Sequence, residues 1–380
     1  KVHRREEMGA ERDFRIADQQ RRVEYILVVA AHINVAFHHR IHAGGVTDTF
    51  GSELILLATV LQSDDFTTVI KLFLIALFLL GGMGPFDSIT YAATTISTGG
   101  FANHAGSFGH FRSTTVEWAG VGGMILGGAN LALLFRALRP GARRSLWRSF
   151  ELRAYLAVIF VGGIAVTLLT ASPDEVTHET IRHALFHVAS AASTTGHFVG
   201  GWGDWEVGAQ VLLIAIVGVG AMSGSAGGGF RLVRALTLVG YLRRELVLQL
   251  HPHAVSPVRV GRRIVSDALV SRMIGYQAQY LIVAATGAVA VAALGGELVT
   301  AMTAAISAIA NFGPALGDLV PGSGGILQLP RPARASLLPL MFLGRLEIAP
   351  VLVGAALAAS ELARRTTNGR DRVDRWRGRD

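Results

Sequence analysis

Cysteine is absent from all 380 residues, and charged residues are scarce. Without cysteine, the chain can form no disulfide and can offer no thiolate to a metal ion. Only 16% of the residues are Asp, Glu, Lys or Arg, whereas a soluble domain usually carries about a quarter. Residues 1–22 are polar with mixed charge, a composition that does not resemble a cleavable signal peptide.

Apolar residues make up 51% of the chain, and the mean hydropathy is +0.44. Long runs with almost no charge cover residues 118–135, 155–170 and 207–222. Each approaches the roughly 20 apolar residues that a helix needs to cross a bilayer. We therefore expect an all-α polytopic membrane protein in contact with lipid.

Arginine gathers in clusters, within 136–153, 231–263 and 364–379, while the turns between them hold few basic residues. The positive-inside rule places such clusters in the cytoplasm. We expect the loops with Arg143 and Arg262 to be cytoplasmic, and those with Asp204 and Asp318 to be external. The net charge of +8 then belongs to cytoplasmic loops and does not indicate a nucleic-acid partner.

A unit of just under a hundred residues repeats along the chain. Two copies close on Ile96-Ser97-Thr98-Gly99 and Ser193-Thr194-Thr195-Gly196, and a weaker third closes on residues 310–314. The repeat predicts these divisions: a polar segment at 1–22, a returning helix of an incomplete first repeat at 23–45, a second pore repeat at 46–137, a third at 138–250, a fourth at 264–363 and a basic cytoplasmic tail at 364–380.

Each repeat contains a short apolar segment on the arginine-poor side, at 86–97, 182–194 and 298–310. About twelve or thirteen residues are too few to span a bilayer as a helix. Non-helical backbone at membrane depth persists only when it is buried in protein or lines a watery path. A short helix that enters from outside points its negative dipole end at the membrane centre, and the turn after it can aim carbonyl oxygens at a cation.

These motifs, in this order and spacing, resemble the Trk/Ktr/HKT superfamily of cation transporters, and most closely its TrkH-type potassium uptake subunit. The second pore loop is similar over 83–88 and 97–104, the third over 193–196 and 203–205, and the fourth over 311–317. Residues 223–231 resemble the intramembrane gating loop of the family, and 344–348 resemble the signature of its last helix. The resemblance covers roughly residues 66–362.

The resemblance implies repeated helix–pore-helix–helix units around a pseudo-fourfold cation pore, and potassium uptake across the cell membrane of a bacterium or archaeon. The implied filter residues, acting mostly through backbone carbonyls, are Thr98, Gly99, Gly100, Thr195, Gly196, Phe312 and Gly313. K⁺ is the transported ion, with no cofactor and no catalytic residue. A homodimer and a cytosolic nucleotide-binding regulatory subunit are the implied protein partners.

The implied gate is the stretch Ser223, Gly224, Ser225, Ala226, Gly227, Gly228 and Gly229, together with Arg345. Six of these seven loop residues are Gly or Ser, and each glycine weakens a helix by about 1 kcal/mol relative to alanine. The other interpretation of the stretch is a helix-packing surface of small residues. Arg345 lies in an apolar segment far from any expected helix end, which favours a functional role over a salt bridge to Glu347 or snorkelling.

The chain departs from the family in two respects. It shows three pore repeats rather than four, which indicates a truncated or divergent chain, and Ala226 replaces the more usual hydroxyl residue of the gating loop. Sodium selectivity or sodium coupling therefore stays open, as do a proton-coupled mechanism and a non-conducting membrane protein. His104, His110, His187 and His197 fall near the expected outer mouth, where they would tune conduction with pH or serve as interfacial residues.

Overall fold

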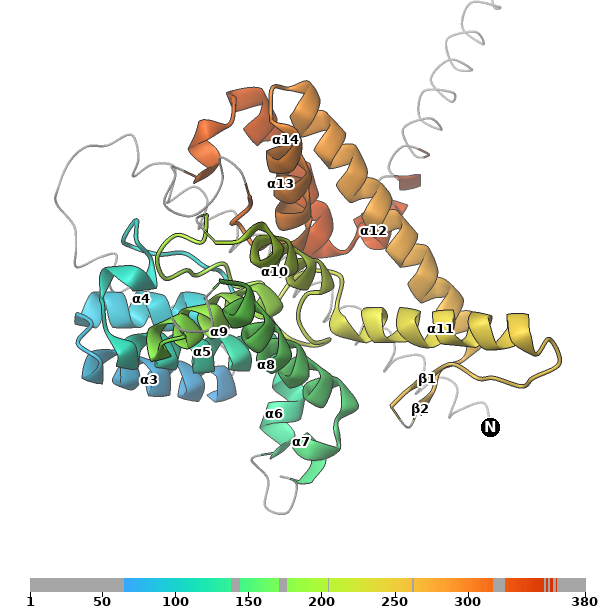
Figure 1. Ribbon diagram of the computed structural model, residues 1–380, viewed down its shortest axis with the longest axis horizontal. Helices are drawn as coiled ribbons and strands as arrows, with labels where there is room; N and C mark the ends of the chain where they lie inside the picture. The colour runs from blue at the N-terminus through green and yellow to red at the C-terminus, as the bar shows by residue number, and fades with distance from the viewer. Residues whose placement is uncertain are drawn as a thin grey trace, which may run out of the picture. The chain divides into compact units, whose positions relative to one another are not determined.

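The computed structural model describes residues 65–137, 144–170, 176–203, 205–261, 263–316 and 325–351, with scattered positions up to 360. The first helices in this part are α3 (Asp65–Leu80), α4 (Pro85–Ile96), α5 (Thr114–Gly128), α6 (Leu131–Ala137) and α7 (Arg144–Arg148). They are followed by α8 (Phe150–Thr170), α9 (His178–Ser193), α10 (Val207–Val219), α11 (Leu232–Leu250), α12 (Asp267–Ala293), α13 (Leu298–Ala310) and α14 (Arg331–Leu346) (Figure 1).

The all-α prediction is confirmed for nearly all of this part. The exceptions are two 3₁₀ turns, η1 (Phe108–His110) and η4 (Gly325–Gln328), and a small antiparallel hairpin that the sequence did not predict. Its strands are β1 (Arg259–Val260) and β2 (Arg263–Ile264), joined next to the end of α11 (Figure 1). The division into repeats stays a prediction, and its segments 1–22 and 23–45 lie outside the described residues.

Within the described residues, α8 and α12 are long and apolar enough to cross a membrane. On α8, Phe160, Val161, Ile164 and Leu168 are more than half exposed, whereas Tyr155 and Ile159 on the opposite face are buried. Exposed apolar side chains on one face and a packed second face are what lipid contact requires, because lipid replaces water around the apolar surface.

The apolar run 118–135 is not one straight helix. It divides into α5 and α6, which meet at an angle of 103°. Main-chain groups from elsewhere occupy the carbonyls at the break: Met222 N–H donates to Gly128 O at 3.1 Å, and Ala226 N–H donates to Gly127 O at 3.3 Å. The break is thus stabilised by a distant segment, which a local apolar pattern cannot reveal.

Three short helices, α4, α9 and α13, each pack between longer neighbours. Helix α4 contacts α3 and α5, α9 contacts α5, α8 and α10, and α13 contacts α10, α12 and α14. Their bounds follow the expected segments closely, except that α9 begins four residues earlier. Thr177 explains this difference, since its Oγ1 accepts the Thr180 N–H at 3.2 Å and caps the helix.

The expected helical run 207–250 is interrupted between Val219 and Leu232, a wider gap than the seven residues predicted from composition. Helix α14 also ends earlier than expected. Glu347 has a φ of +64°, and Arg345 therefore lies in the last turn of the helix. The prediction that Arg345 is far from a helix end was wrong.

Candidate functional site: three turns and a loop

The chain takes the same backbone course after each short helix. Thr98, Thr194 and Asn311 have left-handed φ angles of 52°, 55° and 56°. Two residues later, Gly100, Gly196 and Gly313 have φ angles of 66°, 87° and 102°. The sequence repeat paired Gly99 with Gly196, but the backbone angles pair Gly100 with Gly196. Thr194 and Asn311, which the sequence analysis did not select, are the structural equivalents of Thr98.

The N–H groups of these turns are bonded back to the short helices. In the third turn, Thr195 N–H donates to Ser190 O at 2.9 Å and Gly196 N–H to Ser190 Oγ at 3.1 Å. In the fourth turn, Phe312 N–H and Gly313 N–H donate to Ser307 O and Oγ at 2.9 and 3.0 Å. One serine in each helix thus fixes two consecutive amides.

The second turn shares only part of this arrangement. Gly99 N–H donates to Thr94 O at 2.7 Å. The hydroxyl of Thr94, at the position equivalent to Ser190, instead donates to Tyr91 O at 3.3 Å. This turn therefore has one fewer amide held by a side chain, which makes it the least restrained of the three.

The three turns lie against one another. A Cβ added at Gly100 would be 2.0 Å from the carbonyl oxygen of Thr195, and one added at Gly196 would be 2.1 Å from that of Phe312. Only glycine fits at these two contacts, because the backbone also adopts positive φ there. The structure thus brings together all seven residues predicted as a filter: Thr98, Gly99, Gly100, Thr195, Gly196, Phe312 and Gly313.

The carbonyls in these turns are chemically available. Within the described residues, no N–H or O–H donates to the oxygen of Thr195 or Phe312. Both follow the C-terminal ends of helices, where the helix dipole is negative. Closely spaced, unpaired carbonyl oxygens at such ends can replace part of the hydration shell of a monovalent cation.

The Gly/Ser loop lies directly against the ends of α9 and α13. Gly228 N–H donates to Thr194 Oγ1 at 2.7 Å, and a Cβ at Gly228 would be 2.2 Å from Ala310 O. A Cβ at Gly227 would be 2.6 Å from Ser193 O. Glycine is required here because two other main chains approach the loop, and the interpretation as a plain helix surface does not fit this geometry.

Two arginines contact the loop. Arg345 Nη1 donates to Ala226 O at 2.9 Å. Arg231 Nη1, which the sequence analysis did not select, donates to Met222 O at 3.3 Å and Ser225 O at 3.5 Å. The alternative salt bridge from Arg345 to Glu347 is absent from the described contacts, since Glu347 pairs with Arg234 at 2.8 Å.

A buried ion pair, also missed from the sequence, fixes the start of α9. Glu117 in the first turn of α5 accepts from Arg182 Nε at 2.5 Å, and both residues are less than 10% exposed. His183 Nε2 lies 3.5 Å from the same carboxylate oxygen. The pair joins the third short helix to its neighbour across the outer half of the fold.

The segment after the second turn carries a polar cluster. Asp87 accepts from Asn103 Nδ2 at 3.0 Å and lies 3.1 Å from His104 Nε2. Partial burial raises the pKa of Asp87, but these hydrogen bonds and the nearby His104 and His110 outweigh it, so the pKa is below its usual value. His104 also stacks on His110 with ring centroids 3.8 Å apart.

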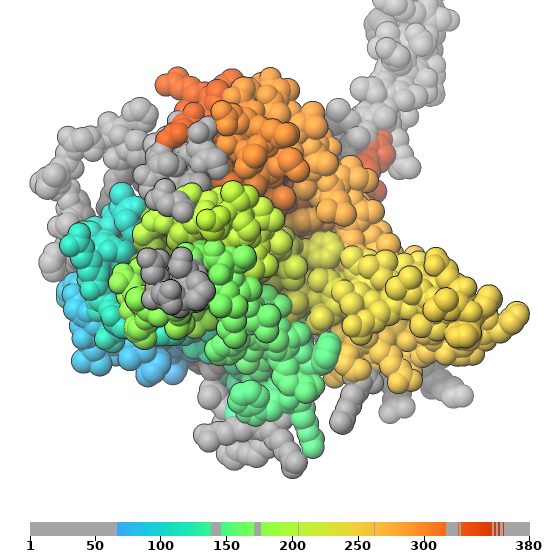
Figure 2. Space-filling view, viewed as in Figure 1, coloured from blue at the N-terminus to red at the C-terminus, as the bar shows by residue number. Residues whose placement is uncertain are grey.

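The four histidines expected at the outer mouth do not form one cluster. His197 is buried 3.2 Å from Thr95 Oγ1, and His187 is buried against Trp205. Ser107 and Val199 pair as a β-bridge, which joins the segments that follow the second and third turns. These segments, cyan and yellow-green, lie next to each other on the face shown in Figure 2.

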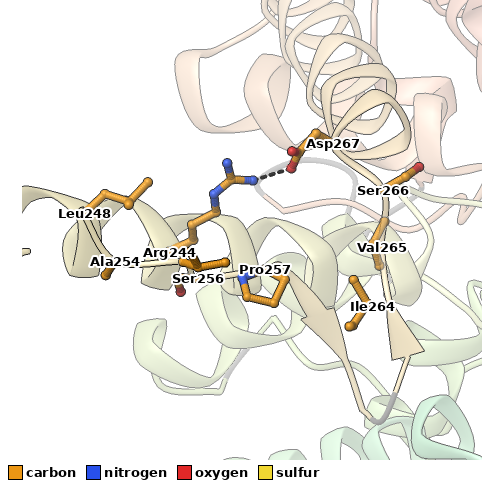
Figure 3. Close-up of a pocket in the computed structure, with 10 residues that line it drawn as sticks. Arg244, Leu248, Ala254, Ser256, Pro257, Ile264, Val265, Ser266 and Asp267 are labelled. Carbon is orange, nitrogen blue, oxygen red and sulfur yellow. Dashed lines mark hydrogen bonds and ion pairs between the residues drawn. The ribbon is translucent and has the colours of Figure 1, made fainter. Parts of the chain in front are cut away.

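A cavity of about 310 Å³ lies elsewhere, between the end of α11, the hairpin and the start of α12. Arg244 and Asp267 face each other across it as an ion pair (Figure 3). None of the residues that line this cavity belongs to the three turns or to the Gly/Ser loop. The cavity is therefore separate from the converging carbonyls.

Comparisons with known proteins point to one family. The family model of TrkH, described as a cation transport protein, matches residues 52–363. The Trk system potassium uptake protein TrkI of Halomonas elongata is 31% identical over 277 residues, which are 73% of this chain and 56% of that protein. TrkH of Escherichia coli is 30% identical over 274 residues, which are 72% of this chain and 56% of that protein.

The crystal structure of the potassium transporter TrkH from Vibrio parahaemolyticus superimposes with a TM-score of 0.69 at 28% sequence identity. The superposition covers 82% of this chain and 65% of that one. The chain thus spans little more than half the length of the curated relatives that it matches. The matched family is one of transporters rather than enzymes, and its fold is polytopic and helical. Since its family model covers most of the sequence, the chain belongs to the TrkH family of cation transport proteins.

Proposed function

We propose that this protein provides a potassium pathway across a bacterial or archaeal cell membrane, in which it is a multi-pass protein. The single observation that carries the proposal is the convergence of three helix-terminal turns whose carbonyl oxygens approach the glycines of the neighbouring turn to about 2 Å of a would-be Cβ. The printed names of the relatives, Trk system potassium uptake proteins, support potassium as the ion.

The proposed filter consists of the carbonyls from Thr98 to Gly100, of Thr195 and Gly196, and of Phe312 and Gly313. Their amides are held by the short helices, so the carbonyl positions are set before an ion arrives. A preformed ring of dipoles lowers the cost of removing water from the ion, because little reorganisation remains to be done.

The proposed gate is the loop Ser223–Gly229 with Arg345. The loop contacts the inner ends of α9 and α13, which places main chain across the expected path on the arginine-rich side. The Arg345 guanidinium, bonded to Ala226 O, adds a positive charge that repels cations. Together they form a barrier that must move before an ion passes.

The proposed assembly contains two copies of the chain and a cytosolic nucleotide-binding regulatory subunit. This proposal follows from membership of the family and from the basic segments 136–153 and 231–263. An acidic surface on the regulator would complement them. Chemical crosslinking in membranes, with and without the neighbouring cytosolic protein, tests both contacts.

The orientation can be tested with single cysteines, because the chain contains none. External labelling should modify cysteines at 204 and 318 and spare those at 143 and 262, positions that all lie outside the described residues. The reverse pattern would contradict the assignment of a cytoplasmic face from arginine.

Transport itself is tested by ion flux in proteoliposomes and by growth of a potassium-uptake-deficient strain at low potassium. The wild type should restore growth, whereas Gly196→Asp should not, because a side chain there enters the space of Phe312 O. Competition between potassium and sodium distinguishes a sodium-selective protein. Absence of flux for any monovalent cation would leave the non-conducting alternative.

A further inference from the structure

Ser223, the first residue of the Gly/Ser loop, is held on both sides by side chains from two different helices. Asn130 Nδ2 donates to Ser223 O at 2.6 Å, and Glu151 Oε1 accepts the Ser223 N–H at 2.7 Å. Asn130 lies at the break between α5 and α6, and Glu151 lies in the first turn of α8. The contacts hold the two opposite polar groups of one residue.

Asn130 also caps the helix that follows it. Its Oδ1 accepts the Leu133 N–H at 2.8 Å, while Leu131 N–H donates to Gly224 O at 3.2 Å. The beginning of α6 is thus bonded to the loop through both a side chain and the main chain. Any displacement of α6 must either carry the loop along or break these bonds.

Helices α6 and α7 form a turn that begins at Asn130 and leads to Glu151. Helix α6 packs on α7, and α7 packs on the start of α8. A cavity of about 250 Å³ lies beside the two contacts, lined by Asn130, Ala132, Leu133, Arg136, Ser149, Glu151 and Met222. The cavity leaves space next to Ser223, so the start of the loop can shift without displacing a packed core.

We propose that Asn130 and Glu151 are positioning residues that latch the loop through Ser223, and that the α6–α7 turn is the arm through which a force on the cytoplasmic face reaches the gate. The inference rests on the proposed function of the loop as a gate. A small rotation of α6 relative to α8 separates the two latch residues, and Ser223 cannot then keep both bonds. The arm therefore converts a displacement at one face into release of the loop.

The test uses the whole protein and substitutions that separate capping from latching. Asn130→Asp keeps the oxygen that caps α6 but replaces the amide donor with a carboxylate, which cannot donate to Ser223 O. Glu151→Ala removes the acceptor, whereas Glu151→Gln retains a carbonyl oxygen that can accept the same N–H. Arg136→Gln is the matched control, since Arg136 lines the same cavity and makes no contact with the loop among the described residues.

Potassium flux in proteoliposomes should rise about threefold to tenfold in Asn130→Asp and in Glu151→Ala, the effect of losing one hydrogen bond that favours the closed state. The preference for potassium over sodium should not change, since no filter residue is altered. Glu151→Gln and Arg136→Gln should remain near the wild type. The double variant should show less than the product of the two single effects, because both act on one residue.

Amide hydrogen exchange of the peptide that contains residues 223–226 gives a second measurement that does not depend on transport. Exchange there should accelerate in Asn130→Asp and Glu151→Ala at unchanged thermal stability. Unchanged exchange in both variants overturns the latch, as does equal behaviour of Glu151→Ala and Glu151→Gln. Failure of the wild type to carry any cation overturns the proposed function instead, and the exchange result then still decides whether Ser223 is latched.

Discussion

Replacement of Gly196 by alanine tests whether the three turns form the ion pathway. The new Cβ would lie 2.1 Å from the carbonyl oxygen of Phe312, whereas ordinary contacts begin at 3.4 Å. Gly196 also has a φ of +87°, which costs a residue with a side chain about 1–3 kcal/mol. Alanine at this position must therefore displace a proposed ion ligand as well as strain its own backbone.

Two other glycines separate these effects. Gly313 has a φ of +102°, but a Cβ there would meet nothing within 4 Å among the described residues, so Gly313→Ala adds strain without this clash. Gly218 lies in α10, with no positive φ and open space around it. Gly218→Ala should preserve transport, and it should stabilise the helix by up to about 1 kcal/mol.

A displacement of about 1 Å at a preformed site can reduce activity by about a hundredfold. We therefore expect potassium flux through Gly196→Ala to fall by about that factor, with altered potassium-to-sodium preference in the residual flux. Gly313→Ala should lose stability but retain more flux. The measurement is potassium and sodium flux in proteoliposomes at matched amounts of folded protein. Wild-type flux and preference in Gly196→Ala would refute the assignment of these turns to the pathway.

Three further predictions concern other parts of the site. Arg345→Ala should raise flux severalfold without changing ion preference, because it removes both the bond to Ala226 O and a positive charge from the path; unchanged flux at normal expression would show that Arg345 only supports packing. Arg182→Leu should lower the free energy of unfolding by about 3–5 kcal/mol, since it leaves the Glu117 carboxylate buried without its partner, whereas the double replacement of both residues by leucine should recover much of this in thermal unfolding. Asp87→Asn should lower stability at neutral pH. Since the pKa of Asp87 is lowered in the fold, the stabilisation from its carboxylate is complete above the unfolded value of about 3.9 and is lost as the pH falls below that value, so the difference from the wild type should shrink in unfolding measured near pH 3.

The short helices could be predicted from the sequence because length alone distinguishes them. A segment of twelve or thirteen apolar residues followed by small polar residues and glycine cannot span a bilayer, and α4, α9 and α13 occur where such segments stand. The chemistry of the turns could be predicted only to within one residue. Ser97-Thr98-Gly99 matches Thr194-Thr195-Gly196 as letters, but the left-handed residue is Thr98 in one and Thr194 in the other.

The contacts of the Gly/Ser loop could not be predicted, because its partners are far away in the sequence. Asn130 is 93 positions from Ser223 and Glu151 is 72 positions from it. Neither residue type is unusual at a helix start, where Asn and Glu serve as ordinary caps. The break between α5 and α6 was hidden for the same reason, since its apolar run contains only glycines to mark the position where Met222 and Ala226 bind.

Thr194 connects the proposed gate to the proposed filter. Its backbone provides the left-handed turn that precedes Thr195, and its hydroxyl accepts the N–H of Gly228. Serine would keep that acceptor, but valine would lose it while filling nearly the same volume. Because the same residue shapes the turn and holds the loop, release of the loop removes a restraint from the third turn, whereas the second turn has no such contact among the described residues. Opening should therefore alter ion preference through the third turn first. A dependence of the potassium-to-sodium ratio on the state of the gate, abolished in Thr194→Val but not in Thr194→Ser, is the result expected from this arrangement.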